Sequence, residues 1–240
     1  MWKWSAIYAR IELIKAFDGG HYMKRITLYL VRHGQTFFNR YNRMQGWSDS
    51  PLTEKGIADA ELAGKQLSKV NFAQAYSSDR SRAMDTAKII LKKSFYLDTP
   101  YTITPHFREE FYGYYEGEDS AKAWYMTGAS HDAKTFKEII TKYSLDASKD
   151  FMKEADPFND AENAAEYWAR VGKGFKQIRS ECSDGDNVLM VSHGTTIRSI
   201  VGKFGNGQFD VTVSPMNGSI TKVVLTDEGV TVQSYNELTL

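Results

Sequence analysis

Two histidines stand in matched surroundings although 160 positions separate them along the chain. His33 follows Val-Arg and precedes Gly, and His193 follows Val-Ser and precedes Gly. Each of these runs continues an apolar stretch of the kind that forms a buried strand. Because ligands bind beyond the carboxyl ends of the strands in open α/β sheets, both imidazoles are expected to project into one crevice.

Hydrogen-bond donors and positive charges surround these histidines. Arg32 and Asn39 flank His33, and Arg82 stands at the start of a helix that follows a second predicted strand. Two arginines, an amide, a second imidazole and a helix N-terminus suit the binding of a phosphoryl group. Positive charge also lowers the pKa of an imidazole, which would keep His33 neutral and nucleophilic. The neighbouring Arg80 is expected to be a solvated residue at the helix start.

Two adjacent glutamates, Glu109 and Glu110, follow a third predicted strand end. A carboxylic acid at this place could protonate a departing alkoxide, which makes a phosphate ester a workable leaving group. Taken alone, two adjacent glutamates are more typical of a solvated loop.

The elements that would position these residues alternate between strand and helix. Strands are predicted over 27–32, 72–76, 101–107 and 187–192, helices over 52–70, 81–92, 161–182 and 195–204, and a closing hairpin over 219–226 and 230–235. Thr53 is the expected N-cap of the first of these helices. The alternation predicts an α/β fold around a mostly parallel sheet, and the continuous apolar strands indicate burial on both faces.

Residues 118–162 interrupt this alternation. They hold ten Asp or Glu and six Lys together with many large apolar side chains, among them Trp124, Tyr125, Met126, Phe136, Tyr143, Phe151 and Phe158, so they are expected to form a helical insertion rather than a linker. The aromatic residues among them either form the core of the insertion itself or contact the apolar part of a substrate.

The first 22 residues differ from the rest of the chain. Charged residues interrupt their apolar stretch, so they do not form a signal peptide, although an amphipathic helix from Trp4 to Phe17 is one alternative. We expect residues 1–22 to be a non-native leader and Met23 to open a domain that extends to residue 240.

Composition excludes several classes of protein. The 240 residues carry 30 Lys+Arg and 30 Asp+Glu, so no overall positive charge exists to hold nucleic acid or an anionic membrane. The single cysteine, Cys182, excludes an intramolecular disulfide framework and a Cys-based zinc site. No apolar run approaches the roughly 18–20 residues that a membrane span needs. We therefore expect a cytoplasmic enzyme that has neither nucleic acid nor a membrane as its partner.

Five motifs, in order and spacing, resemble those of the histidine phosphatase superfamily, whose fold is phosphoglycerate-mutase-like. They are LVRHGQTFFN (30–39), QGWSDSPLTEKG (45–56), SSDRSRAMDTA (77–87), REEFYGYYEG (108–117) and VLMVSHGTTIR (188–198). The resemblance implies a three-layer α/β/α fold in which the insertion at 118–162 caps the crevice. It also implies a phosphohistidine mechanism that requires neither a metal ion nor another cofactor.

The resemblance assigns a role to each candidate site residue. His33 would attack phosphorus, and Glu109 would protonate the leaving group and then activate water, with Glu110 as the local alternative. The expected phosphate-binding residues are Arg32, Asn39, Gln45, Gly46, Arg82, His193, Gly194 and Thr195. Of these, Arg32, Arg82 and His193 would also stabilise the charge of the transition state.

The resemblance leaves three functions to weigh. Phosphoglycerate mutases of the family carry an ERHYG-type segment, whereas positions 110–111 here lack its Arg-His pair, and the aromatic-EG sequence that ends at Gly117 resembles the phosphatase branch. The excess of acidic residues in 118–162 is also expected to disfavour strongly anionic substrates. We therefore predict a metal-independent phosphomonoester hydrolase acting on a small-molecule phosphate ester. A cofactor-dependent mutase is the alternative, and a regulatory module that binds phosphorylated ligands is the third hypothesis. The oligomeric state, including a homodimer, stays open.

Overall fold

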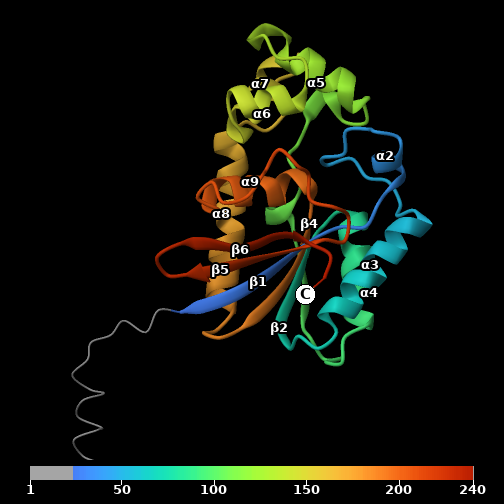
Figure 1. The fold of residues 1–240 in the computed structure, drawn as a ribbon, viewed down its shortest axis with the longest axis vertical. Coiled ribbons are helices and arrows are strands. Elements are labelled where there is room, and N and C mark those ends of the chain that lie inside the picture. Colours follow the sequence, from blue (N-terminus) through green and yellow to red (C-terminus); the bar gives the residue numbers. More distant parts are fainter. Residues whose placement is uncertain (1–23, 240) are drawn as a thin grey trace, which may run out of the picture.

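The structure is a computed structural model that describes residues 24–239, built around one six-stranded sheet (Figure 1). The strands are β1 (Arg25–Arg32), β2 (Phe72–Ser78), β3 (Tyr101–Thr104), β4 (Asn187–Ser192), β5 (Ile220–Thr226) and β6 (Val230–Glu237). Their order in the sheet is β3-β2-β4-β1-β5-β6. The first four strands in this order run parallel to one another, and β5 and β6 add an antiparallel hairpin at one edge. The predicted mostly parallel sheet and the closing hairpin are confirmed.

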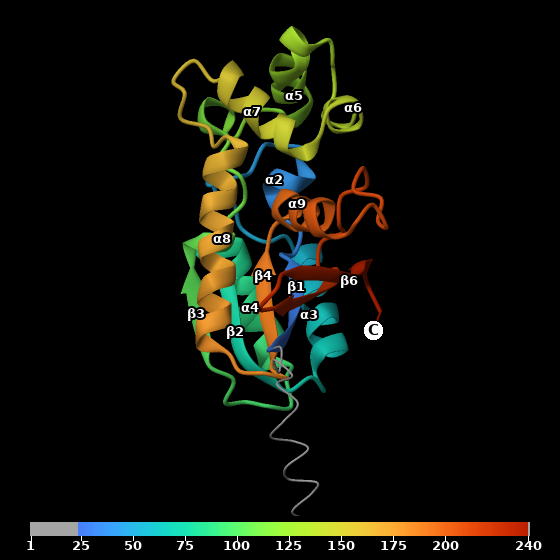
Figure 2. The ribbon, with the colours of Figure 1, turned by 90° about the vertical axis from the view of Figure 1, so that its left-hand side faces the viewer.

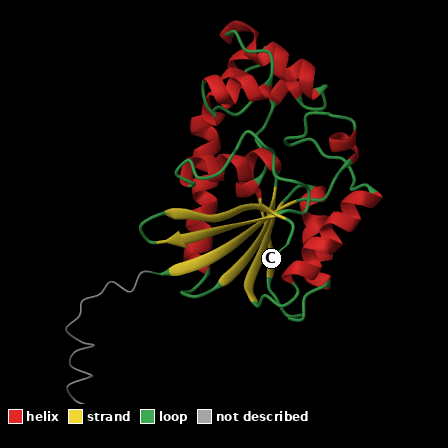
Figure 3. Cartoon of the chain, viewed as in Figure 1, coloured by secondary structure: helices red, strands yellow, loops and turns green. Residues whose placement is uncertain are grey.

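Helices cover both faces of the sheet (Figures 2 and 3). The α-helices are α2 (Phe37–Arg40), α3 (Glu54–Leu67), α4 (Ser81–Lys92), α5 (Ser120–Gly128), α6 (Phe136–Lys142), α7 (Leu145–Ala155), α8 (Ala164–Glu181) and α9 (Gly194–Phe204). Short 3-10 turns occupy η1 (Pro105–Phe107), η2 (Gly113–Tyr115) and η3 (Ala129–His131). Within residues 24–239, each helix is too short or too polar to cross a lipid bilayer.

Strand β1 divides its side chains between two cores, as the period of two residues in a strand requires. Leu28 and Leu30 pack in a cluster with α8 and α9, whereas Tyr29 and Val31 belong to the cluster that contains α3 and α4. The sheet therefore lies between two helical layers, and the three-layer α/β/α architecture is confirmed.

The pairing of β1 with β4 determines where the two histidines lie. The two strands are neighbours and parallel, and Arg32, the last residue of β1, stands opposite Ser192, the last residue of β4. The next residue on each strand is a histidine, so His33 and His193 leave the same edge of the sheet side by side.

Residues 118–162 contain helices α5, α6 and α7, which lie beyond the carboxyl ends of the strands in Figures 1 and 2. Their apolar side chains form a third cluster, in which Trp124 and Ile139 pack with Tyr112 and Tyr115 from the preceding segment. Trp124, Phe136 and Phe151 thus pack in the cluster of the segment itself, whereas Tyr125, Tyr143 and Phe158 are exposed.

Several predicted boundaries differ from the structure. The third strand ends at Thr104 rather than at residue 107, because Pro105 lacks the N–H that a strand needs and opens a 3-10 turn instead. The long helix begins at Ala164 rather than at residue 161, because Asn163 and Glu166 form a reciprocal capping box. Thr53 caps α3 as predicted. The leader at 1–22, with its alternative helix from Trp4 to Phe17, and the start at Met23 lie outside the described residues.

Candidate active site

A cavity of about 150 Å³ opens where β1 and β4 end. The predicted site residues that line it are Arg32, His33, Asn39, Gln45, Glu109, Gly194 and Thr195. The other three predicted residues, Gly46, Arg82 and His193, are buried beside this lining. Groups from five separate motifs therefore meet at one place.

His33 is held in one tautomer by the backbone. Its Nδ1 lies 2.8 Å from the carbonyl oxygen of Gly34, which can only accept a hydrogen bond, so Nδ1 carries the proton. The lone pair of Nε2 is consequently free to attack an electrophile. The loop can turn here because Gly34 has no side chain: a Cβ at this position would lie 2.1 Å from the carbonyl oxygen of Gly56.

The two imidazoles lie edge to face, with 5.2 Å between ring centroids. Burial and the nearby guanidinium groups of Arg82 and Arg32 hold the pKa of His33 well below its usual value of 6.5. Burial lowers the pKa of His193 in the same way, with Arg82 and His33 adding to the effect. Both rings are therefore neutral at neutral pH.

Arg32 is oriented by a loop that carries none of the family motifs. Its Nη1 donates to the carbonyl oxygen of Pro215 at 2.6 Å, while its buried Nε has no partner within residues 24–239. Asn217 of the same loop donates to the carbonyl oxygen of His33 at 2.8 Å. The loop thus fixes the guanidinium of Arg32 and the backbone of His33 together.

Arg82 has no exposed surface, and the loop at 45–49 surrounds it. Its Nη1 donates to the carbonyl oxygen of Ser48 at 2.8 Å and to the Asp49 carboxylate at 2.9 Å. Its Nη2 donates to the carbonyl oxygens of Gln45 at 3.1 Å and Gly46 at 2.7 Å. Its buried Nε has no partner in the described part of the chain. The other N–H donors of the guanidinium are thus all used within the protein, and Nε is not.

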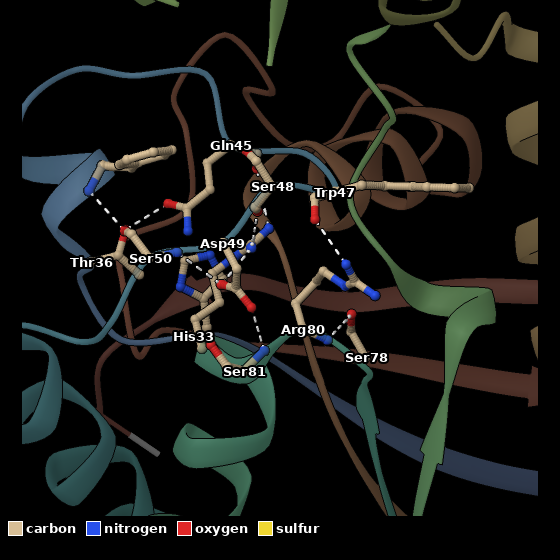
Figure 4. A network of polar contacts seen from close by, with 12 residues as sticks. His33, Thr36, Gln45, Trp47, Ser48, Asp49, Ser50, Ser78, Arg80 and Ser81 are labelled. Carbon is tan, nitrogen blue, oxygen red and sulfur yellow. Dashed lines mark hydrogen bonds and ion pairs between the residues drawn. The ribbon is translucent and has the colours of Figure 1, made fainter. Parts of the chain in front are cut away.

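The expectation that Arg80 is solvated is wrong. Its Nη1 donates to the carbonyl oxygen of Trp47 at 2.8 Å, and Figure 4 shows this contact together with the one between Asp49 and Ser81. Arg80 and Arg82 together hold the carbonyl oxygens of residues 45–48.

The amide groups of Asn39 and Gln45 are turned so that their nitrogen ends are available. Asn39 Oδ1 accepts from the backbone N–H of Thr36 at 3.2 Å, within the capping box of α2. Gln45 Oε1 accepts from the Thr36 hydroxyl at 2.6 Å, and its buried Nε2 has no partner among residues 24–239. Both side chains line the cavity, so both can donate to an anion there.

Glu109 lies at the N-terminus of α9. Its carboxylate accepts from the backbone N–H groups of Thr195 and Thr196, each at 2.8 Å. Its carbonyl oxygen accepts from the Trp47 indole at 3.2 Å and from Arg170 at 3.1 Å. The carboxyl group of Glu109 is thus held against the cavity from both its side chain and its backbone.

Glu110 has a different environment. It is fully buried, and neither of its carboxyl oxygens has a hydrogen-bond partner within the described residues. Burial raises its pKa to about 8, with Glu109 and Glu162 raising it further and Lys149 and Arg170 opposing the shift. Of the two neighbouring glutamates, Glu109 is the one that lines the cavity.

Reasoning from the net charge of residues 118–162 does not describe the cavity. The residues of this segment that line it are Ser120, Trp124 and Phe136, so its acidic side chains face elsewhere. Arg43 and Arg198, which the sequence analysis did not single out, add positive charge to the lining. Only the fold shows which side chains of a charged segment face a site.

Arg198 and Asn217 are the clearest omissions of the sequence reasoning. Arg198 ends the fifth motif, and its Nε donates to the carbonyl oxygen of Val211 at 2.9 Å. Its position four residues after Gly194 on a helix was a usable signal, because residues four apart share a helix face. Asn217 offered no such signal, since its loop has no motif.

The arrangement as a whole suits phosphoryl chemistry. A neutral imidazole with a free Nε2 faces a small cavity that several unpartnered donors and one carboxylate surround. Within residues 24–239, no three His, Cys, Asp or Glu side chains are grouped so that they could hold a metal ion.

Comparison with known proteins identifies the family. A sequence model of the histidine phosphatase superfamily (branch 1) matches residues 28–238. The chain belongs to this superfamily. The resemblance derived from the five motifs is therefore confirmed.

Proteins named phosphoglycerate mutases and proteins named phosphatases are both similar to this chain. A phosphoglycerate mutase from Bacillus anthracis str. Sterne is 33% identical with a TM-score of 0.83, over 90% of this chain and 95% of its own. The 2,3-bisphosphoglycerate-dependent phosphoglycerate mutase 2 of Gloeobacter violaceus is 33% identical over 72% of this chain and 73% of its own length. The putative alpha-ribazole-5'-P phosphatase of Escherichia coli shares the fold, with 20% identity, a TM-score of 0.64 and coverage of 90% of this chain and 98% of its own.

The first prediction concerns the protonation of the two histidines. Because burial and the arginines lower both pKa values, His33 and His193 should stay neutral as the pH falls from 8 through 6.5. NMR of ring-¹⁵N-labelled protein should show both in neutral tautomers at pH 6, with the proton of His33 on Nδ1. The variants His33→Gln and His193→Gln assign the signals. An imidazolium signal from His33 at pH 6.5 would contradict the prediction.

The second prediction concerns Glu110. Its folded pKa of about 8 lies above the usual value of 4.5, so the folded protein keeps a proton that the unfolded chain loses between these pH values. The contribution of Glu110 to the free energy of unfolding should therefore fall as the pH rises from 4.5 to 8, and Glu110→Gln removes this contribution. As the pH rises, we expect the free energy of unfolding of Glu110→Gln to increase relative to that of the wild type, by up to about 1.4 kcal/mol per pH unit.

Urea unfolding at pH 5, 6.5 and 8 measures this difference. The exposed Glu228 supplies the control, because Glu228→Gln should change the free energy of unfolding by a similar small amount at each pH. A difference between Glu110→Gln and the wild type that does not depend on pH would contradict the prediction.

Proposed function

We propose that the protein is a metal-independent phosphomonoester hydrolase that acts through a phosphohistidine intermediate. The observation that carries the proposal is the free Nε2 of His33 in a cavity that Glu109 also lines. The nucleophile and a group able to carry protons thus line the same small cavity. This combination is not needed by a module that only binds phosphorylated ligands.

The reaction has two steps. His33 Nε2 attacks phosphorus, a P–N bond forms, the P–O bond to the alcohol breaks, and Glu109 gives its proton to the departing oxygen. Water then attacks the phosphohistidine while Glu109 takes a proton from it, so that inorganic phosphate leaves and His33 is restored. Each step returns Glu109 to the state that the other step requires.

The charge of the phosphoryl group would be stabilised by arginine, imidazole and amide donors. Arg32 Nε, Arg82 Nε and Gln45 Nε2 are buried donors with no partner in the part of the chain that the structure describes. Preorganised donors of this kind stabilise a transition state because they need not reorient when its charge develops. The neutral ring of His193 can donate one further bond.

Two features favour hydrolysis over mutase activity. Glu110 and Phe111 stand where the mutases carry an Arg-His pair, and Glu110 is buried away from the cavity, so this pair of positions offers no cation to a substrate carboxylate. The outer lining includes Tyr112, Trp124 and Phe136, which suit an ester with an apolar or ring-bearing portion.

Mutase activity is the second candidate, and a specific observation favours it. Arg43 and Arg198 line the same cavity as His33, so two cations are available to a second anionic group such as a carboxylate. The mutase names of relatives that are 31–33% identical point the same way.

The third prediction tests the covalent intermediate. Wild-type protein quenched after brief exposure to a ³²P-labelled phosphomonoester should retain a label that acid releases and alkali does not, as expected of phosphohistidine. His33→Asn should retain no label and show no turnover, because the nucleophile is lost. His193→Asn should keep a residual rate reduced by about 10²–10³, the usual cost of losing one donor to the transition state.

His131 is a control for this experiment, since it lies outside the cavity lining and contacts Glu154. His131→Asn should label as the wild type does. A label that survives acid, or normal turnover in His33→Asn, would contradict the assignment of the nucleophile.

The fourth prediction separates the two candidate reactions. With 3-phosphoglycerate as substrate and 2,3-bisphosphoglycerate as primer, release of inorganic phosphate should exceed formation of 2-phosphoglycerate. The reason is that water should reach the phosphohistidine, where Glu109 can activate it, before a second transfer occurs. ³¹P NMR of one reaction mixture follows both products. Isomerisation faster than phosphate release would make mutase activity the function.

A further inference from the structure

The carboxylate of Glu116 gathers the backbone N–H groups of the loop that surrounds Arg82. It accepts from Gly46 at 3.1 Å, from Trp47 at 2.7 Å and from Ser48 at 3.0 Å, and also from the Ser48 hydroxyl. The backbone N–H of Tyr112 adds a further bond at 3.2 Å. Three consecutive peptides of the loop thus point their donors at one side chain.

The carbonyl groups of the same loop point at arginines. Arg82 donates hydrogen bonds to the carbonyl oxygens of Gln45, Gly46 and Ser48, and Arg80 donates one to that of Trp47. The peptide dipoles therefore lie between a carboxylate at their positive ends and guanidinium groups at their negative ends. Each charge strengthens the orientation that the other favours, as in any polarised chain of hydrogen bonds.

The loop has little room to relax around these contacts. A Cβ on Gly46 would lie 2.1 Å from the carbonyl oxygen of Glu110 and 2.3 Å from Oε1 of Glu116. The backbone of residue 46 is thus packed directly against the glutamate and against the segment that carries Glu109. A shift of this loop would move the acceptors of Arg82 and also Gln45, whose amide lines the cavity.

We propose that Glu116 is a positioning residue of the active site, which holds Arg82 and Gln45 in place through the peptides of residues 46–48. Its carboxylate oxygens accept from the N–H groups of the loop and carry the same sign of charge as a phosphoryl group, so it acts on such a ligand only through these side chains. The inference rests on the proposed function only in taking a phosphoryl oxyanion as the ligand of this cavity. This role of Glu116, the glutamate of the aromatic-EG sequence, could not be predicted from its position in the motif.

The experiment measures binding of orthovanadate and of inorganic phosphate to the full chain by isothermal titration calorimetry, alongside turnover and melting temperature. Glu116→Gln keeps the shape of the side chain but replaces one acceptor oxygen by an amide group that cannot accept. We expect the vanadate Kd to rise and kcat/KM to fall by about 10- to 100-fold, the scale of a displacement of roughly 1 Å in a catalytic group.

Asp156→Asn is the matched control. Asp156 is a buried carboxylate that, like the half-buried Glu116, accepts from backbone N–H groups, those of Tyr114, Phe158, Asp160 and Ala161, but it lies outside the cavity lining. Its variant should lower the melting temperature as Glu116→Gln does and leave the vanadate Kd within about twofold. A role confined to stability would make the two variants alike in both measurements.

A double-mutant comparison tests the route through Arg82. If Glu116 acts by positioning this side chain, adding Glu116→Gln to Arg82→Gln should weaken vanadate binding far less than it does in the wild type, because residues of one network are not additive. Glu116→Asp keeps the charge with a shorter reach and should give an intermediate Kd, which supplies the comparison if Glu116→Gln does not fold.

The outcomes separate this inference from the proposed function. Unchanged vanadate affinity in folded, active Glu116→Gln overturns the positioning role and leaves the hydrolase standing. Weakened vanadate binding in Glu116→Gln, in a protein whose wild type hydrolyses no phosphomonoester, supports the positioning role and counts against the hydrolase. Equal losses of affinity in Asp156→Asn and Glu116→Gln also overturn the inference.

Discussion

A guanidinium with no exposed surface must have its charge and its donors satisfied inside the protein, and Arg82 imposes this condition on the whole site. The Asp49 carboxylate and three backbone carbonyl groups meet most of it. They can do so only if residues 45–49 wrap around the side chain, and this wrapping turns the N–H groups of the loop outward to Glu116. The path of the loop and the place of Gln45 follow from one buried charge, and Gly46 has no side chain because a Cβ there would meet Glu110 and Glu116.

The same charge also acts on the two histidines. Burial disfavours imidazolium, and the positive charge of Arg82 acts in the same direction, so the pKa values of His33 and His193 fall together. A neutral His33 is what a nucleophile requires, and the hydrogen bond from its Nδ1 to Gly34 leaves Nε2 as the reactive atom. The positive charge that would attract a phosphoryl anion into the cavity therefore also adds to the effect of burial in keeping His33 Nε2 unprotonated.

Much of this arrangement could be predicted from local sequence, because it depends on where strands end. Apolar runs before His33 and His193 located both residues at strand ends, and the parallel register of β1 and β4 then brings them together. Capping signals located the start of α3 at Thr53 in the same way. Such features depend on residues that are close neighbours in sequence, whose types carry the information.

Contacts between distant segments could not be predicted in this way. Arg80 seemed solvated because its acceptor, the carbonyl oxygen of Trp47, lies 33 residues away and has no side-chain signature. Asn217 and Glu116 likewise act on backbone groups of remote loops. The net charge of residues 118–162 was a poor guide to the substrate for a related reason, because a sum of charges does not tell in which direction each side chain points. The residues of this segment that face the cavity include Trp124 and Phe136.

The adjacent glutamates show how strongly the direction of a side chain determines its chemical environment. Glu109 and Glu110 are neighbours in the chain, but their side chains enter different environments. Glu109 meets the free N–H groups at the start of α9, which satisfy its oxygens at the edge of the cavity. Glu110 enters the interior, where neither oxygen finds a partner within residues 24–239 and burial raises its pKa to about 8. The surroundings of Glu110 alone thus raise its proton affinity above that of an ordinary carboxyl group. Of the two, Glu109 can exchange a proton with a ligand, because it is the one in contact with the cavity. Glu110 can act on that ligand only through the field that it exerts on its neighbour.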